Sequence, residues 1–179
     1  LPFYARLPRR LTRLLDALPL LRWAASKAGS TRPESLEDMF ISMLRGEHGR
    51  QASELDRLIH WLRAHAKPDI VHLSNALLLG LAPRITRDVG VPVVCSLQDE
   101  DGWIDSMQPD AASRAWALMR SLATHVAAFA PVSDYYREFM RTRLDLPATQ
   151  LCTVPIGLAL DDYAPSSLPF DPPVIGFLS

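Results

Sequence analysis

The chain has 179 residues, 48% of them apolar and 22% charged, and its formal net charge is −1. This length suits one well-buried domain and is too short for two ordinary ones. The composition excludes a disordered chain, and the longest apolar runs, such as residues 76–82, are too short to cross a bilayer.

The positive charge is concentrated in the first 32 residues, which carry seven basic residues against one acid. Leucines recur there at helical spacing, with most of the arginines off that stripe. Residues 1–32 are therefore predicted to form a basic amphipathic helical segment, interrupted at Pro19. Such a helix either packs on the domain or lies at a membrane surface, with residues 6–27 as the candidate for peripheral membrane contact. No motif supports nucleic-acid binding.

A cationic loop is predicted between two helices. Apolar spacing indicates one helix over residues 35–44 and a second helix that ends before Pro68. The loop between them carries Arg45, His48 and Arg50 and is flanked by glycines. Because its charge suits a phosphate or carboxylate, these three residues are candidates for anion binding. A solvated surface loop is the alternative.

From residue 69 onward, short apolar runs alternate with helical patterns. Near-continuous apolar strands separated by helices are typical of a parallel sheet that is covered on both faces. The predicted fold class is α/β, a Rossmann-like parallel sheet with helices on both faces. The predicted strands are residues 69–73, 91–97, 126–132 and 151–154, and the predicted helices are residues 75–88, 110–124 and 134–144.

Polar residues follow the predicted strands, and ligands of open parallel sheets bind beyond the carboxyl ends of the strands. Three consecutive acids after the second strand can bind sugar hydroxyls or a metal, or shift one another's pKa, unless they lie in a solvated loop. Trp103 either stacks on a sugar ring or anchors that loop. Ser133 is predicted to cap a helix whose free N–H groups can also hold an anion. The candidate residues are Ser74, Asn75, Gln98, Asp99, Glu100, Asp101, Ser133 and Gly157.

Several motifs of other protein classes are missing from the sequence. It contains neither a dinucleotide-binding glycine motif, nor a P-loop, nor the serine motif of hydrolases. Cys95 and Cys152 have no CxxC spacing and no nearby histidine, so no metal site is predicted, and both cysteines are expected to be buried and reduced. No signal-peptide pattern is present, and a cytoplasmic location is expected.

Five short segments occur in the order and spacing of a known enzyme family. From residue 35 to residue 179 the sequence resembles the N-terminal domain of a GT-B glycosyltransferase of the retaining, family-4 type. The segments that carry this resemblance are residues 68–72 (PDIVH), 90–94 (GVPVV), 130–133 (APVS), 154–157 (VPIG), and 162–165 (DYAP) leading into 174–177 (VIGF).

The resemblance implies a division of the chain and an activity. Residues 1–165 would form a Rossmann-like acceptor-side domain, and residues 166–179 the linker and first strand of a nucleotide-sugar-binding domain. The intact enzyme would move a sugar from a nucleotide-sugar to a glycan, lipid or small-molecule acceptor. It would retain stereochemistry and need no metal or other cofactor. Since the family's glycine-rich first loop would precede Leu1 and its donor-binding half would follow Ser179, this chain is expected to be a fragment without transferase activity of its own.

The chain departs from the family pattern at two places. Gln98 stands where the family usually has a histidine that contacts the donor, so the side chain there does not titrate. Ile156 precedes Gly157 where the family has asparagine, and Asp161 or Asp162 would be a shifted acid of this turn. Two other functions remain open: a self-contained Rossmann-like ligand-binding module that uses the acidic loop, and a nucleotide-sugar epimerase or hydrolase of related architecture.

Overall fold

The computed structural model describes residues 33–157 and residue 159. The predicted basic amphipathic segment of residues 1–32, with its membrane-contact candidate of residues 6–27, lies outside this part of the chain. The predicted linker and first strand of a second domain, residues 166–179, also lie outside it. Within it, no helix is both long enough and apolar enough to cross a membrane.

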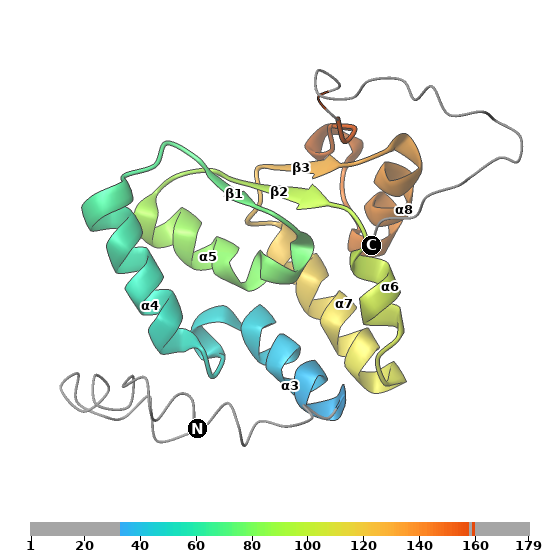
Figure 1. The fold of residues 1–179 in the computed structure, drawn as a ribbon, viewed down its shortest axis with the longest axis horizontal. Helices are drawn as coiled ribbons and strands as arrows, with labels where there is room; N and C mark the ends of the chain where they lie inside the picture. The colour runs from blue at the N-terminus through green and yellow to red at the C-terminus, as the bar shows by residue number, and fades with distance from the viewer. Residues whose placement is uncertain (1–32, 158, 160–179) are drawn as a thin grey trace, which may run out of the picture.

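A parallel sheet forms the centre of the described chain (Figure 1). Strands β1 (Val71–Leu73), β2 (Val93–Leu97) and β3 (Ala128–Pro131) lie in chain order. In this register Leu73 lies beside Cys95, and Cys95 lies beside Phe129. The α/β, Rossmann-like fold class predicted from the sequence is confirmed.

The predicted fourth strand is reduced to a bridge between Leu151 and Phe129. The N–H of Cys152 donates to the Phe129 carbonyl at 3.0 Å, and the N–H of Val154 donates to the Pro131 carbonyl at 2.9 Å. Successive side chains of such an extended segment point to opposite sides. Leu151 is therefore buried and Cys152 exposed, so the prediction of two buried cysteines holds for Cys95 and is wrong for Cys152.

The helices match the predicted ones in place, with three differences. Helix α3 begins at Pro33, not at residue 35, and proline suits a first helical turn. The helix predicted over residues 75–88 consists of three pieces, and the change from the first to the second comes just before Pro83, which has no N–H to continue the ladder. The short helix α6 was not predicted. The helical elements are α3 (Pro33–Leu44), η2 (Gly46–His48), α4 (Ala52–Trp61), η3 (Leu62–Ala66), η4 (Ala76–Leu81), α5 (Ala82–Arg84), η5 (Ile85–Val89), α6 (Glu100–Asp105), α7 (Pro109–Ala123), α8 (Asp134–Leu144) and η6 (Ala148–Gln150).

The two faces of the sheet are covered to different degrees. Helices α3, α4 and α7 lie on the same side of the strands (Figure 1), and α3 packs against α7 and η4. Right-handed crossovers between strands that lie in chain order place the connecting helices on one face. Side chains on one face of the sheet are buried, whereas the side chains next to them along each strand, which point to the other face, are more exposed. The buried ones are Leu73, Val93, Cys95, Leu97 and Phe129, and those half-buried or exposed are His72, Val94, Ser96, Ala128 and Ala130.

Two glycines allow the backbone at the end of α3 to touch that of η4. A Cβ added at Gly80 would lie 2.0 Å from the Met43 carbonyl oxygen. Gly46, whose φ is +53°, lies against the backbone of Gly80, and a Cβ there would lie 2.4 Å from the Gly80 carbonyl oxygen. Side chains at these positions would push apart the two segments that position the cationic loop.

We expect Gly80→Ala to lower the free energy of unfolding by about 2 kcal/mol or more, because the added methyl meets backbone that cannot move aside. Gly102→Ala is the matched control. The nearest atom to its new methyl lies at 3.6 Å, and alanine favours the α6 helix. Urea unfolding of both variants measures the difference. Equal stability of the two would contradict the close approach.

Candidate functional site

The polar residues that follow β1, β2 and β3 lie together at the carboxyl edge of the sheet. Hydrogen bonds join all three loops. Ser74, Gln98 and Asp99 are exposed there, whereas Asn75, Asp101 and Ser133 are half-buried and Glu100 is buried. Gly157 is exposed beyond the segment that pairs with β3, and none of the hydrogen bonds found in the described chain connects it to the other loops.

Glu100 holds the first two loops together from inside the protein. Only 3% of this residue is exposed. Its Oε1 accepts the N–H of Ala76, after β1, at 2.9 Å, and its Oε2 accepts the N–H groups of Gln98 at 2.9 Å and Asp99 at 3.2 Å. The three consecutive acids therefore do not all face solvent at the rim. Glu100 is a positioning residue, because its oxygens are occupied by backbone donors.

The hydroxyl of Tyr136 ties the third loop to the second. It accepts the N–H groups of Asp99 at 3.1 Å and Glu100 at 3.0 Å, and it donates to Glu100 Oε2 at 2.9 Å or Asp101 Oδ1 at 2.8 Å. Burial, and then the negative charge of Glu100, raise the pKa of Tyr136. The hydroxyl thus stays protonated near neutral pH. Sequence reasoning placed Tyr136 only in the apolar stripe of its helix, although a buried tyrosine hydroxyl normally needs a polar partner.

Asp99 has a strained backbone at the same point. Its φ of +142° lies in a region that residues other than glycine rarely adopt. Such strain persists only where surrounding contacts enforce it, and it is frequent at ligand sites. Here Tyr136 and Glu100 both hold the Asp99 N–H. The exposed side chains of Gln98 and Asp99 therefore extend from a fixed backbone. The Gln98 amide can donate and accept hydrogen bonds, and the Asp99 carboxylate beside it can accept them.

Three other candidates have structural partners. The Ser133 hydroxyl accepts the Tyr136 N–H at 3.1 Å and caps α8, as predicted. Asn75 Oδ1 accepts the Leu77 N–H at 3.1 Å and caps η4. Trp103 packs edge-on against Phe40 of α3, with ring centroids 4.7 Å apart, which agrees with the loop-anchor interpretation.

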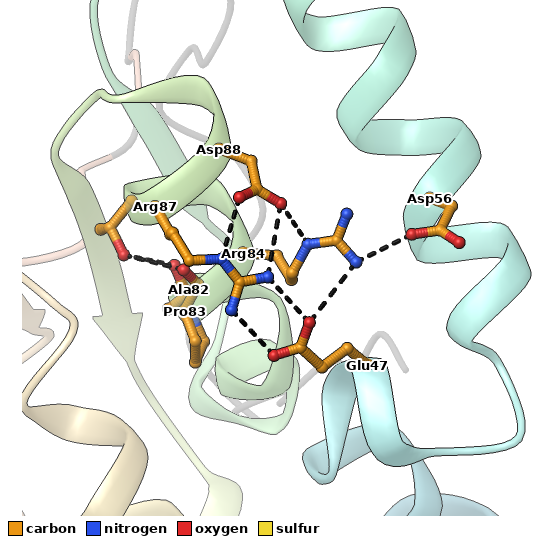
Figure 2. Close-up of polar contacts among 8 residues, drawn as sticks. Glu47, Asp56, Ala82, Pro83, Arg84, Arg87 and Asp88 are labelled. Atoms are coloured by element: carbon orange, nitrogen blue, oxygen red, sulfur yellow. Dashed lines mark hydrogen bonds and ion pairs between the residues drawn. The ribbon is translucent and has the colours of Figure 1, made fainter.

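Arg45, His48 and Arg50 belong to a second region, at the η2 loop, where all three are exposed. An ion-pair network holds this loop to its neighbours (Figure 2). Glu47 accepts two hydrogen bonds from Arg87, at 2.9 and 2.8 Å.

Arg84 extends the same network to α4 and along its own helix (Figure 2). It donates to Asp56 at 2.8 Å and also binds Asp88. Hydrogen bonds from Arg87 and Arg84 lower the pKa of Asp88 to about 2. The Glu47 pKa is also lowered, chiefly by its hydrogen bond with Arg87. These charges fix η2 against α4 and η5.

Among residues 33–157 and 159, no group of three or more histidine, cysteine, aspartate or glutamate side chains is arranged to hold a metal ion. A metal-independent reaction stays a prediction.

We expect Tyr136→Phe to lower the free energy of unfolding by about 1–3 kcal/mol, since it removes the acceptor of the buried Glu100 N–H and a hydrogen-bond donor to the Glu100 and Asp101 carboxylates. Tyr135→Phe, on the same helix but 79% exposed, should change it by less than about 0.5 kcal/mol. Urea unfolding tests both variants. A loss shared equally between them would show that the Tyr136 hydroxyl does not hold the loops.

We expect Asp88→Asn to lower the urea midpoint at neutral pH, and this difference from the wild type to shrink as the pH falls from about 4 towards 2. The folded pKa lies below the ordinary value near 4, so the stabilisation is present above pH 4 and lost as Asp88 is protonated. High salt should also narrow the difference, because the network is near the surface. A difference in urea midpoint that grows as the pH falls would show that the folded state does not lower the Asp88 pKa.

A family model described as glycosyl transferase 4-like domain matches residues 1–157 of the chain. No curated protein and no solved structure matched it. The family match agrees with the parallel sheet and with the resemblance seen in the short sequence segments. The chain belongs to the glycosyl transferase 4-like domain family and is a glycosyltransferase domain.

Proposed function

We propose that this domain is the acceptor-side half of a retaining glycosyltransferase whose donor is a nucleotide-sugar. The observation that carries the proposal is the hydrogen-bonded edge of the sheet, where Glu100 and Tyr136 hold the backbone of Gln98 and Asp99 in place. Ligands of parallel α/β sheets bind beyond this edge. A rigid edge with exposed amide and carboxylate groups suits the many hydroxyls of a sugar.

The two exposed side chains take different roles in this proposal. The Gln98 amide can both donate to and accept from a hydroxyl, and it does not titrate. The Asp99 carboxylate accepts a hydroxyl hydrogen bond and orients that oxygen. In the transfer itself, the acceptor oxygen bonds to the anomeric carbon, the bond from that carbon to the donor phosphate oxygen breaks, and the nucleotide leaves with the electron pair. The acceptor proton passes to the departing phosphate or to water.

The nucleotide-sugar would be held mainly by a second α/β half that follows this domain, so the 179-residue chain alone would not transfer sugar. The transfer would need no metal and no organic cofactor, as the family resemblance of the sequence implies. The acceptor is a hydroxyl of a glycan, a lipid or a small molecule. Peripheral membrane contact through residues 6–27 belongs to the same proposal and is supported by the basic composition of that segment.

A cytoplasmic location is also proposed, from the state of the cysteines. Cys95 and Cys152 are both free thiols. Burial, and then the charge of Glu100, raise the pKa of the Cys95 thiol, so it stays protonated and unreactive. Unpaired cysteines are usual in reducing compartments.

Nucleotide release from a panel of nucleotide-sugars tests the proposal. The isolated chain should release none, whereas a polypeptide that joins it to a nucleotide-sugar-binding half should do so and form a product of retained anomeric configuration by NMR. In that polypeptide, Gln98→Ala and Asp99→Asn should lower kcat/KM at least about tenfold, the loss of one charged or polar contact. Asp110→Asn, an exposed acid at the start of α7, is the control and should stay within about twofold.

Three results would contradict separate parts of the proposal. Turnover by the isolated chain would place the donor site within it. An inverted product would exclude the retaining mechanism. Normal kinetics of both rim variants would show that substrate binds away from the carboxyl edge of the sheet.

A further inference from the structure

A cationic pocket lies between the η2 loop, α3 and α7, and it shares no residue with the carboxyl edge of the sheet. Its volume is about 160 Å³. Arg114 of α7, which sequence reasoning did not connect with this loop, joins the three anion-binding candidates there. The polar residues that line it are Asp38, Ser42, Arg45, His48, Arg50 and Arg114.

The arginines of this pocket lie around one cavity and have no acidic partner among the described residues. In the described part of the chain, Arg84, Arg87, Arg137, Arg141 and Arg143 all form ion pairs with acids. Within the same residues, no ion pair was found for Arg45, Arg50 or Arg114. Arg57, Arg63 and Arg120 also form none there, but they do not line the pocket. The lining contains one acid, Asp38, against these three arginines. Guanidinium groups gathered around a small cavity repel one another, and an anion in the cavity would remove that repulsion.

The neighbouring acid of the loop is already engaged elsewhere. Glu47 lies between Arg45 and His48 in the sequence, but its carboxylate binds Arg87 and Arg84, which do not line the pocket (Figure 2). The loop therefore directs its negative group to the ion-pair network and leaves basic groups at the cavity.

The backbone of the loop is held rigidly at the cavity wall. The buried Ser42 hydroxyl accepts the Arg50 N–H at 2.7 Å and donates to Gln51 Oε1 at 2.8 Å. Gly49 touches the same residue, since a Cβ there would lie 1.9 Å from the Ser42 carbonyl oxygen. A loop fixed in this way loses little conformational entropy when an anion binds.

We propose that this pocket binds the phosphate group of a ligand. Arginine forks match phosphate oxygens in pairs, and three of them around a cavity of this size suit one phosphate or diphosphate. The phosphate belongs either to a water-soluble compound or to a lipid headgroup, which present the same oxygens to the arginines. The site is independent of the transfer chemistry proposed above.

Calorimetric titration of the whole 179-residue chain with inorganic pyrophosphate at low salt tests the proposal. Saturable binding is expected, weaker at higher salt, and Arg114→Ala should weaken it at least about tenfold, the loss of one charge-assisted pair. Arg63→Ala is the matched control, because it removes the same charge from an exposed position outside the pocket. It should stay within about twofold. The melting temperature of both variants establishes that they are folded.

Flotation with vesicles of phosphatidylglycerol and phosphatidylcholine, against phosphatidylcholine alone, distinguishes the two sources. Pyrophosphate binding with the expected variant pattern supports a soluble phosphate ligand. Vesicle binding that Arg114→Ala weakens and Arg63→Ala does not, in the absence of pyrophosphate binding, supports a lipid headgroup. Failure with both probes, or equal losses in the two variants, overturns the phosphate site.

Discussion

The buried carboxylate of Glu100 is the group on which the carboxyl edge of the sheet depends. Its oxygens accept backbone N–H groups from the loops after β1 and β2, and Tyr136 connects them to the helix after β3. A buried carboxylate without donors costs several kcal/mol, so each loop that supplies a donor is held where the carboxylate is. Because the three loops share one acceptor, none of them can move independently. The backbone of the exposed Gln98 and Asp99 is therefore held in place by this buried contact.

The loop of the cationic pocket is held in place by close backbone packing and not by a buried carboxylate. Backbone segments at the end of α3, in the η2 loop and in η4 approach so closely that only glycine fits at the contacts. Charged side chains on a flexible loop contribute little to specific binding, because they lose entropy when they are held in one geometry. Here the close packing fixes the backbone of the loop when the protein folds, so the backbone loses little further entropy when an anion binds. Glu47 adds to the arrangement, since its pairing with Arg87 removes a negative charge from the cavity.

The two regions also differ in the chemical groups that they expose. The edge of the sheet offers an amide and a carboxylate from a strained turn, groups that suit neutral hydroxyls. The pocket offers guanidinium groups without acidic partners among the described residues, which suit an anion. The nucleotide-sugar donor and hydroxyl acceptor of the proposed function would carry both kinds of group. The helix α7 connects the regions physically: it follows α6 at the edge of the sheet and contributes Arg114 to the pocket.

The sequence by itself determined the fold class, the order of the three strands and of the helices other than α6, and the Ser133 cap of α8, and it narrowed the cap of η4 to Ser74 or Asn75. These depend on local spacing and on side chains that bind backbone two or three residues away, as Ser133 does with Tyr136. It also placed the candidate residues at the ends of the strands, since parallel strands share one carboxyl edge.

Only the tertiary structure decided the roles of Glu100, Tyr136 and Arg114. The contact between Glu100 and Ala76 spans 24 residues, and that between Tyr136 and Glu100 spans 36. No local pattern records which of three adjacent acids turns inward, because that depends on the donors the other loops supply. In the same way, Arg114 reaches the Arg45–Arg50 loop only because α3 packs against α7. Local periodicity thus set the elements, and long-range packing determined which of their polar groups are buried and hold the loops together and which remain exposed.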